Sequence, residues 1–297
     1  MVRYEILAAA AAVTILAGCR NDIDFDACGQ VDAEQVTVSA EASGRILSLN
    51  VREGDVLNAG QMVGAVDSVQ TSLQIRELEQ RRDGARSRLI DIDRQQAPQK
   101  DQLANLENDF RRYSSLLANN AATQKQVDDL RSQIDILKSQ MAAQKQTWER
   151  NNSSVRSEIS TYEIQIAEKR DQLAKCRICS PVAGTVLTKY ANEGESVTVG
   201  KPLFKLADLT ETYVRAYFNT SQLGTLKLGD EMKVIPDDGS ANPKEYTGRV
   251  IWISSQAEFT PKDIQTRDER AELVYAVKVA VPNDGALRLG MYAYVRK

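Results

Sequence analysis

Residues 44–63 read GRILSLNVREGDVLNAGQMV and residues 184–203 read GTVLTKYANEGESVTVGKPL. Three glycines recur between them at one displacement of 140 positions: Gly44 as Gly184, Gly54 as Gly194 and Gly60 as Gly200. In each stretch, alternating apolar residues are broken by Glu-Gly turns, which predicts strand-turn-strand structure. Two unrelated hairpins would not share one displacement at three glycines. The stretches are therefore an internal repeat, and we expect its halves to pack face to face because one half alone buries little.

The repeat resembles the two halves of a biotinyl-lipoyl domain, a small sandwich with quasi-twofold symmetry. Residues 36–68 are assigned to the first half and residues 178–208 to the second. In the carrier proteins of that family a tight hairpin joins the halves, and its tip holds a Met-Lys-Met-like modification site. Here the first half ends in Val66-Asp67-Ser68, no such lysine motif follows, and residues 69–177 replace the tip.

The inserted residues 69–177 carry two apolar seams with heptad spacing. The first seam runs from Ile75 to Leu117 and the second from Val127 to Leu173. Two such seams with charged flanks predict an antiparallel coiled-coil α-helical hairpin. Each arm has about 50 residues, so the hairpin would reach roughly 75 Å at the helical rise.

Several residues predict local features of this hairpin. Asn119-Asn120 is helix-breaking turn chemistry, and Thr123 is a plausible N-cap for the second arm. Pro98 is expected to kink or briefly break the first arm, because proline inside a helix costs about 3 kcal/mol. Gln144 and Asn151 predict a wetter seam in the middle of the second arm.

Residues 209–297 change to short alternating strands separated by turns. Thr212–Asn219, Tyr246–Ser254 and Leu273–Val281 alternate, and Pro282-Asn283-Asp284-Gly285 is among the turn sequences between strands. Five or six such strands predict a small antiparallel β-barrel. The charged stretch Thr260–Glu272 is expected to be a long exposed excursion from it.

Composition narrows the possible functions. Only 6% of the chain is aromatic, which suggests an elongated molecule with little core. A net charge of −3 gives no electrostatic footprint for nucleic acid. The chain has no histidine, which removes Ser-His-Asp catalysis and histidine-containing metal sites. We expect no catalytic residues, cofactor or metal.

The N-terminus predicts export. Residues 1–18 resemble a signal peptide, with an apolar run from Ile6 to Gly18 that is too short to span a bilayer. The run ends in Leu16-Ala17-Gly18-Cys19, which resembles a bacterial lipobox whose Cys19 thiol would carry the diacylglycerol. A plain secretory signal with a chance cysteine is the alternative. We interpret residues 19–35 as a lipid-anchored linker.

Three further cysteines, Cys28, Cys176 and Cys179, would permit at most one internal disulfide. Cys176-Arg177-Ile178-Cys179 has the spacing of a redox or zinc motif, but no second such pair or histidine completes a zinc site. The pair also follows a predicted helix, whereas a thioredoxin-type site would precede one. Small buried residues without redox function are the favoured interpretation.

The order of lipobox, half-sandwich, helical hairpin, half-sandwich and β-barrel resembles the periplasmic adaptor proteins, also called membrane fusion or HlyD-like secretion proteins. Ser180-Pro181-Val182-Ala183-Gly184 and Leu287-Arg288-Leu289-Gly290-Met291 are its most specific local marks. The family commonly has proline where this chain has Leu289. The resemblance implies a homo-oligomer, as a hexamer, in the periplasm of a Gram-negative bacterium. It would be anchored by its lipid to the inner membrane and link an inner-membrane transporter to a TolC-like outer-membrane channel.

The resemblance also implies a docking motif at the hairpin tip. Adaptors that dock onto a TolC-like channel typically carry Arg, then Leu four positions on, then Ser seven after that. Arg112, Leu116 and Thr123 have this spacing, with Thr in place of Ser. The family would give Arg112 a polar contact with the channel tip, Leu116 an apolar one and Thr123 a hydroxyl contact. A solvated arginine, a seam-flanking leucine and a helix cap are the alternative.

Two other stretches, Glu258–Lys262 and Val274–Val279, look like adaptors of ABC-type exporters. The membrane-proximal domain of many relatives is expected to be missing or rudimentary. Two other classes stay open, namely an enzyme carrier domain, which would need a modifiable lysine, and a structural envelope tether without a channel contact.

Overall fold

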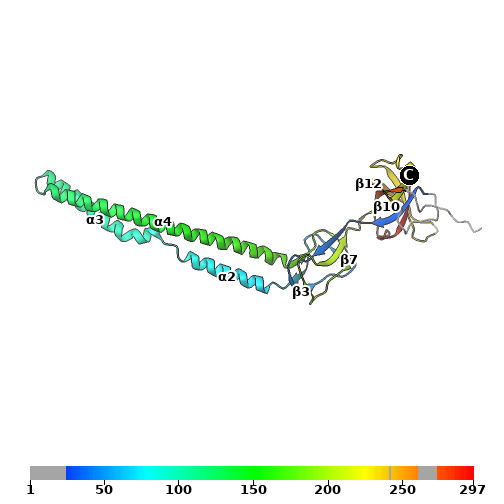
Figure 1. The fold of residues 1–297 in the computed structure, drawn as a ribbon, viewed down its shortest axis with the longest axis horizontal. Helices are drawn as coiled ribbons and strands as arrows, with labels where there is room; N and C mark the ends of the chain where they lie inside the picture. The colour runs from blue at the N-terminus through cyan, green and yellow to red at the C-terminus, as the bar shows by residue number, and fades with distance from the viewer. Residues whose placement is uncertain (1–24, 241, 260–272) are drawn as a thin grey trace, which may run out of the picture.

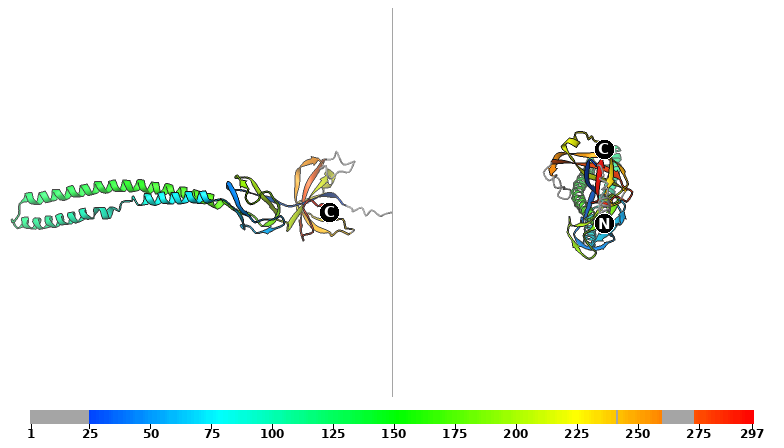
Figure 2. Two further views of the ribbon diagram at one scale, coloured as in Figure 1. Left: turned by 90° about the horizontal axis from the view of Figure 1, so that it is seen from below. Right: turned by 90° about the vertical axis from the view of Figure 1, so that its right-hand side faces the viewer.

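The structure is a computed structural model that describes residues 25–240, 242–259 and 273–297. Figure 1 shows an elongated molecule with a helical hairpin at one end, a β-sandwich in the middle and a β-barrel at the other end. The same order is visible at right angles in Figure 2. The predicted mixed α and β architecture is confirmed. The predicted signal peptide with Cys19, and the predicted excursion at residues 260–272, lie outside the described residues.

The sandwich consists of two four-stranded sheets, ordered β2-β9-β7-β4 and β6-β5-β3-β8. The strands of the first half are β2 (Gln35–Ser39), β3 (Gly44–Leu49), β4 (Val56–Leu57) and β5 (Met62–Val66). Those of the second half are β6 (Arg177–Cys179), β7 (Gly184–Lys189), β8 (Ser196–Val197) and β9 (Pro202–Ala207). In each sheet the two central strands come from one half and the two edge strands from the other, so the halves are interleaved as well as stacked.

The pairing of these strands repeats with the sequence. Gly44 on β3 lies opposite Val197 on β8, while Leu57 on β4 lies opposite Gly184 on β7, which is the same pair with the halves exchanged. The N–H of Gly54 donates to Val186 at 2.9 Å, and that of Gly194 donates to Ile46 at 2.9 Å. Each glycine turn thus closes onto the opposite half, so neither half can form its sheet alone.

The hairpin has three helices: α2 (Val69–Arg86) and α3 (Ile92–Ala118) form one arm and α4 (Gln124–Lys175) the other. With 52 residues, α4 is about 78 Å long. The break in the first arm lies at residues 87–91, and Pro98 lies inside α3. The expected break at Pro98 is therefore misplaced. The helix restarts at Asp91, whose carboxylate caps it by accepting from Arg94 N at 3.2 Å, and Pro98 then falls within the second turn.

Polar residues do enter the middle of the seam, although not all of those expected. Gln99 donates to Gln144 at 3.1 Å, and the buried Gln96 donates to the Met141 carbonyl at 2.9 Å. Asn152 is the buried asparagine of α4, whereas the predicted Asn151 faces solvent. Asn152 lies opposite the break in the first arm, between the part of α4 that packs on α3 and the part that packs on α2.

The barrel is closed by six antiparallel strands in the order β1-β10-β13-β12-β11-β14. Its elements are β1 (Ala27–Asp32), β10 (Glu211–Asn219), the short helix α5 (Thr220–Leu223), β11 (Glu231–Pro236), β12 (Tyr246–Phe259), β13 (Leu273–Pro282) and β14 (Tyr292–Arg296). β1 pairs with both β10 and β14. The interpretation of residues 19–35 as a linker is thus wrong for residues 27–32, because these close the barrel.

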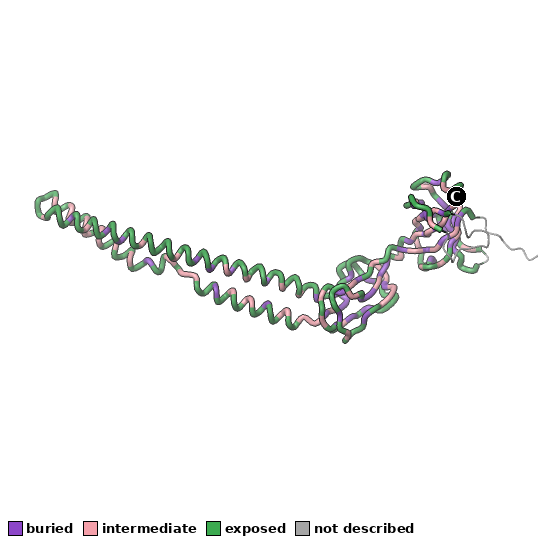
Figure 3. The backbone as a smooth tube through the Cα atoms, in the orientation of Figure 1, coloured by how far each residue is buried: buried purple, intermediate pink, exposed green. Residues whose placement is uncertain are grey.

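Burial follows this architecture. Buried residues gather in the barrel and the sandwich, while along the hairpin they occur singly between exposed ones (Figure 3). Phe218 and Met232 fill the barrel core, and Phe204 and Ile46 fill the sandwich core. The hairpin is therefore an exposed arm that extends from the sandwich, with the barrel on the sandwich's other side.

Candidate docking site at the hairpin tip

The tip is a tight turn with defined backbone geometry. Asn120 has a φ of +57°, in the left-handed region that asparagine tolerates better than most residues. The N–H of Ala121 donates to Leu116 at 2.8 Å, and that of Asn120 donates to Leu117 at 2.9 Å. These two bonds form a Schellman motif, which satisfies the last carbonyls of α3. The turn at the tip is consequently closed by the chain's own hydrogen bonds.

Arg112 and Leu116 lie on the last turns of α3, four residues apart and so on one face of the helix. Arg112 forms an ion pair with Asp109 at 2.9 Å, and its guanidinium lies 5.5 Å from the centre of the Tyr113 ring. Its side chain is nevertheless 65% exposed. Leu116 is 38% exposed. Together they present one cation and one apolar side chain near the end of the arm.

Thr123 begins α4 and caps it. Its Oγ1 accepts from Gln126 N at 3.4 Å, and Gln126 Oε1 in return accepts from Thr123 N at 2.9 Å. This is a capping box, so the cap that the sequence offered as the alternative role is present. Because serine caps in the same way, the Thr for Ser exchange preserves this local geometry.

A groove of about 400 Å³ crosses the seam below the tip. It is lined by Glu107, Phe110, Arg111, Arg131, Ile134 and Lys138. Lys138 pairs with Glu107 at 2.8 Å across the two helices. Sequence reasoning missed this groove because its residues come from both arms, and only the register of the hairpin brings them together.

At the base of the hairpin, where a carrier protein would have its modified lysine, this chain has the start of α2 and the end of α4. β5 leads through Asp67 into α2, and α4 leads through Cys176 into β6. Lys175, the last residue of α4, is paired with Asp171 at 2.7 Å. The position that presents a lysine in a carrier therefore supports the arm here.

Cys176 caps the end of α4, and Cys179 is the last residue of β6. β6 pairs with β5 at Cys179 and Met62, just as β2 pairs with β9 at Ser39 and Pro202, so Cys179 belongs to the repeated strand. Cys176 is buried, and burial raises the pKa of its thiol, the opposite of a reactive cysteine. Cys179 is exposed, which corrects the expectation that both are buried.

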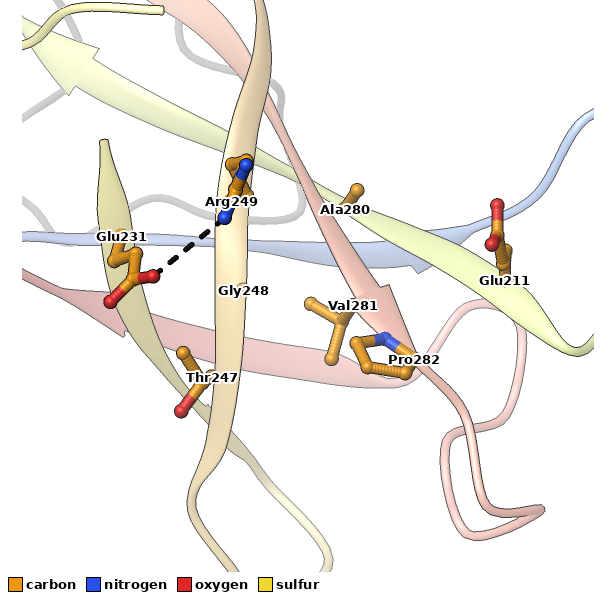
Figure 4. A pocket seen from close by; sticks show the side chains of 8 residues that line it. All are labelled: Glu211, Glu231, Thr247, Gly248, Arg249, Ala280, Val281 and Pro282. Atoms are coloured by element: carbon orange, nitrogen blue, oxygen red, sulfur yellow. Dashed lines mark ion pairs between the residues drawn. The ribbon is translucent and has the colours of Figure 1, made fainter. Parts of the chain in front are cut away.

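A second hollow, of about 300 Å³, lies on the barrel wall (Figure 4). It is lined by Glu211, Glu231, Thr247, Gly248, Arg249, Ala280, Val281 and Pro282. Gly248 packs closely, since a Cβ there would lie 2.6 Å from Val279 Cγ1. Glu231 and Arg249 approach to 3.8 Å and both are largely exposed. Such an open, weakly paired surface lacks the bonded acid, base and nucleophile groups of an active site.

Over the described ranges, no His, Cys, Asp and Glu side chains gather as a metal site would require. Every helix in that part of the chain is too short or too polar to cross a membrane.

A family model described as "RND MFP, barrel-sandwich hybrid domain" matches residues 34–209, more than half of the chain. The chain belongs to the membrane fusion protein family. These proteins are periplasmic adaptors that form oligomers and connect inner-membrane transporters with outer-membrane channels. The matched residues of this membrane fusion protein are the sandwich and its inserted hairpin.

Whole-chain comparisons agree. The membrane fusion protein is 28% identical to a UPF0194 membrane protein of Yersinia pseudotuberculosis, covering 100% of this chain and 99% of the relative. It is also 28% identical to the UPF0194 membrane protein YbhG of Salmonella arizonae, covering 98% and 95%.

Solved structures share the fold. MacA from Actinobacillus actinomycetemcomitans superposes with a TM-score of 0.60 at 19% identity, covering 93% of this chain and 79% of MacA. The membrane fusion protein Spr0693 from Streptococcus pneumoniae R6 gives 0.52 at 18% identity, covering 91% and 96%. The resemblance to periplasmic adaptors that the element order indicated is thus confirmed.

Proposed function

We propose that this membrane fusion protein is a non-enzymatic, lipid-anchored adaptor that bridges an inner-membrane exporter and a TolC-like outer-membrane channel. The exposed pair Arg112 and Leu116 at the end of the hairpin carries the proposal. Arg112 supplies donors for carbonyls or carboxylates, and Leu116 supplies an apolar contact. Thr123 joins them through its hydroxyl while it caps α4.

Cys19 is proposed to hold the lipid at the inner membrane, so that the hairpin extends toward the outer membrane. The proposed assembly is a hexamer in which sandwiches and barrels stack as rings and the hairpins form a tube. Its role is to seal the conduit and to relay the state of the pump.

An ABC-type transporter is the favoured inner-membrane partner, because Glu258–Lys262 and Val274–Val279 resemble adaptors of ABC exporters. A proton-driven pump is the second candidate, favoured by the name of the matching family model, which refers to RND adaptors.

Docking can be tested by placing a photo-cross-linking amino acid at position 116 in living cells. We expect an adduct that mass spectrometry identifies as an outer-membrane channel. Position 136 is the matched control, because Ile136 is also an exposed apolar residue of the hairpin (57% exposed) but lies on α4 away from the tip. Equal adducts at both positions would contradict specific docking.

Substitutions test the same contact by function. Arg112→Ala and Leu116→Ala should abolish export, whereas Arg111→Ala, an exposed neighbour on another helix face, should not. Normal export by the Arg112 and Leu116 variants would favour a structural envelope tether, the alternative without a channel contact.

A further inference from the structure

The barrel end remote from the hairpin exposes apolar side chains that its fold does not require. β1 runs from Ala27 toward the sandwich, so Phe25 lies at this remote end. Phe25 stacks on Tyr294 with ring centres 4.7 Å apart and is still 46% exposed. Leu228, in the turn before β11, is 68% exposed.

A hydrogen-bond network shows that Phe25 and Leu228 belong to one surface. The backbone N–H of Lys297 donates to the Asp26 carboxylate at 2.9 Å. The ammonium group of the same lysine donates to the Thr225 carbonyl at 2.6 Å and to Asp230 at 3.0 Å. Asp26 follows Phe25 and Asp230 closes the turn that carries Leu228. The described start of the chain and residues 225–230 are therefore held together.

The turn that carries Leu228 accepts both polar and apolar residues at this corner. The N–H of Asp230 donates to Lys227 at 3.2 Å, and Gly229 has a φ of +90°, which is a type II turn with Leu228 at its first corner. The same position of the equivalent turn Arg52–Asp55 is occupied by Glu53. A polar residue is compatible with this backbone, so the leucine at position 228 is available for contact with another surface.

The short segment between Cys19 and Phe25 indicates that this other surface is the lipid bilayer. Phe25 is six positions after Cys19, and six extended residue steps span at most about 21 Å. If Cys19 carries the lipid, as proposed above, this barrel end lies within that distance of the bilayer. Phe and Leu are among the side chains that enter the boundary between headgroups and acyl chains, so Phe25 and Leu228 would bury apolar area there.

We propose that the remote end of the barrel rests on the lipid surface, with Leu228 and Phe25 inserted among the headgroups. Asp26 and Asp230 offset the charges of Lys227 and Lys297, so the contact is apolar and depends little on anionic lipid. The lipid on Cys19 holds the protein at the membrane, and this second contact fixes the orientation of the barrel there. The contact rests on the lipidation of Cys19 in the proposed function.

The test uses the mature chain from residue 19 with Cys19→Ser, so that no acyl chain contributes. Co-sedimentation with vesicles of phosphatidylethanolamine and phosphatidylglycerol should recover the protein, and high salt or neutral phosphatidylcholine vesicles should recover it as well. Leu228→Asp should lower the partition coefficient onto vesicles about tenfold, which corresponds to losing the transfer of one leucine.

Val199→Asp is the matched control. Val199 is 66% exposed and occupies the same corner of an equivalent turn, in which Lys201 N–H donates to Thr198 at 3.0 Å, but it lies on the sandwich. It should bind as the parent does. Circular dichroism confirms that both variants fold. Equal loss in both variants, or no sedimentation of the parent with protein-free vesicles, overturns the proposal and assigns the surface to a protein partner.

Failure of the lipid contact is distinguishable from failure of the proposed function. The mass of the native chain reports acylation of Cys19 directly. Arg112→Ala, which tests docking at the other end of the molecule, should sediment with vesicles as the parent does.

Discussion

The side chain of Asn152 bonds both backbone groups of Ile90. Ile90 N donates to Asn152 Oδ1 at 2.9 Å, and Asn152 Nδ2 donates to the Ile90 carbonyl at 2.8 Å. Ile90 lies in the break between α2 and α3, where helical partners are lacking. The amide of Asn152 therefore replaces the missing helix bonds and attaches the broken arm to α4.

Replacing Asn152 with alanine should destabilise the hairpin by roughly 1–3 kcal/mol, because two partly buried backbone groups lose their partners. Chemical denaturation followed at 222 nm, where the hairpin dominates the helical signal, measures this loss. Asn151→Ala removes an exposed neighbour and should change stability by less than about 0.5 kcal/mol. Equal losses of stability in the two variants would mean that the Asn152–Ile90 hydrogen bonds do not stabilise the hairpin.

Leu289→Pro should stabilise the barrel by about 0.4–1 kcal/mol. Leu289 occupies the first corner of a type II turn, in which Met291 N–H donates to Arg288 at 3.0 Å and Gly290 has a φ of +81°. Proline fits that corner and restricts the unfolded chain. Trp252 fluorescence in a Trp148→Phe background reports barrel unfolding.

Leu287→Pro, two residues earlier, gives the contrasting outcome. The N–H of Leu287 donates to Asn283 at 3.1 Å and its side chain is buried, so proline there should destabilise the barrel. A gain in stability from this variant would contradict the assigned turn.

Acid should weaken the loop contact made by Asp284. The Lys244 ammonium, the Ala286 N–H and the Tyr246 hydroxyl lower the pKa of its carboxyl from 3.8 to about 2. A lowered carboxyl pKa stabilises the fold above pH 3.8, and this contribution is lost as the pH falls through about 2. Barrel unfolding by Trp252 fluorescence should therefore become easier across that window.

Asp284→Asn should flatten this part of the pH profile. Asp129→Asn, which removes the same charge from an exposed position of the hairpin, is the control and should leave the profile unchanged. An unaltered profile in Asp284→Asn would remove this carboxyl as the cause.

Gly84→Ala should stabilise α2 by about 0.5–1 kcal/mol. Nothing lies within 4 Å of a Cβ built at Gly84, so the added methyl only restricts the unfolded chain. Thermal unfolding at 222 nm tests this gain.

Gly64→Ala should have the opposite sign. A Cβ there would lie 2.3 Å from the Ser48 carbonyl oxygen, so β5 would have to move away from β3. The variant should unfold at lower temperature, and a neutral result would show that the sandwich can relax.

Much of the fold was predictable from local patterns. The displacement of 140 positions identified the split sandwich, and the heptad seams identified the hairpin, because glycine turns and helical periodicity are properties of neighbouring residues. Arg112, Leu116 and Thr123 became candidates because their spacing resembles the docking motif of channel-binding adaptors. Their exposure and the capping role of Thr123 required the structure.

Pairing between distant residues was decided only by the tertiary structure. β1 closes the barrel through partners such as Val31 and Val214, which are remote in sequence, so its short stretch resembled a linker. The helix break lies at Ile90 and not at Pro98, because Asn152 on the opposite arm satisfies it. The sequence by itself determined which elements exist, since propensity is local. The tertiary structure decided where they join and which polar groups satisfy one another, since those bonds depend on chain segments that meet only after folding.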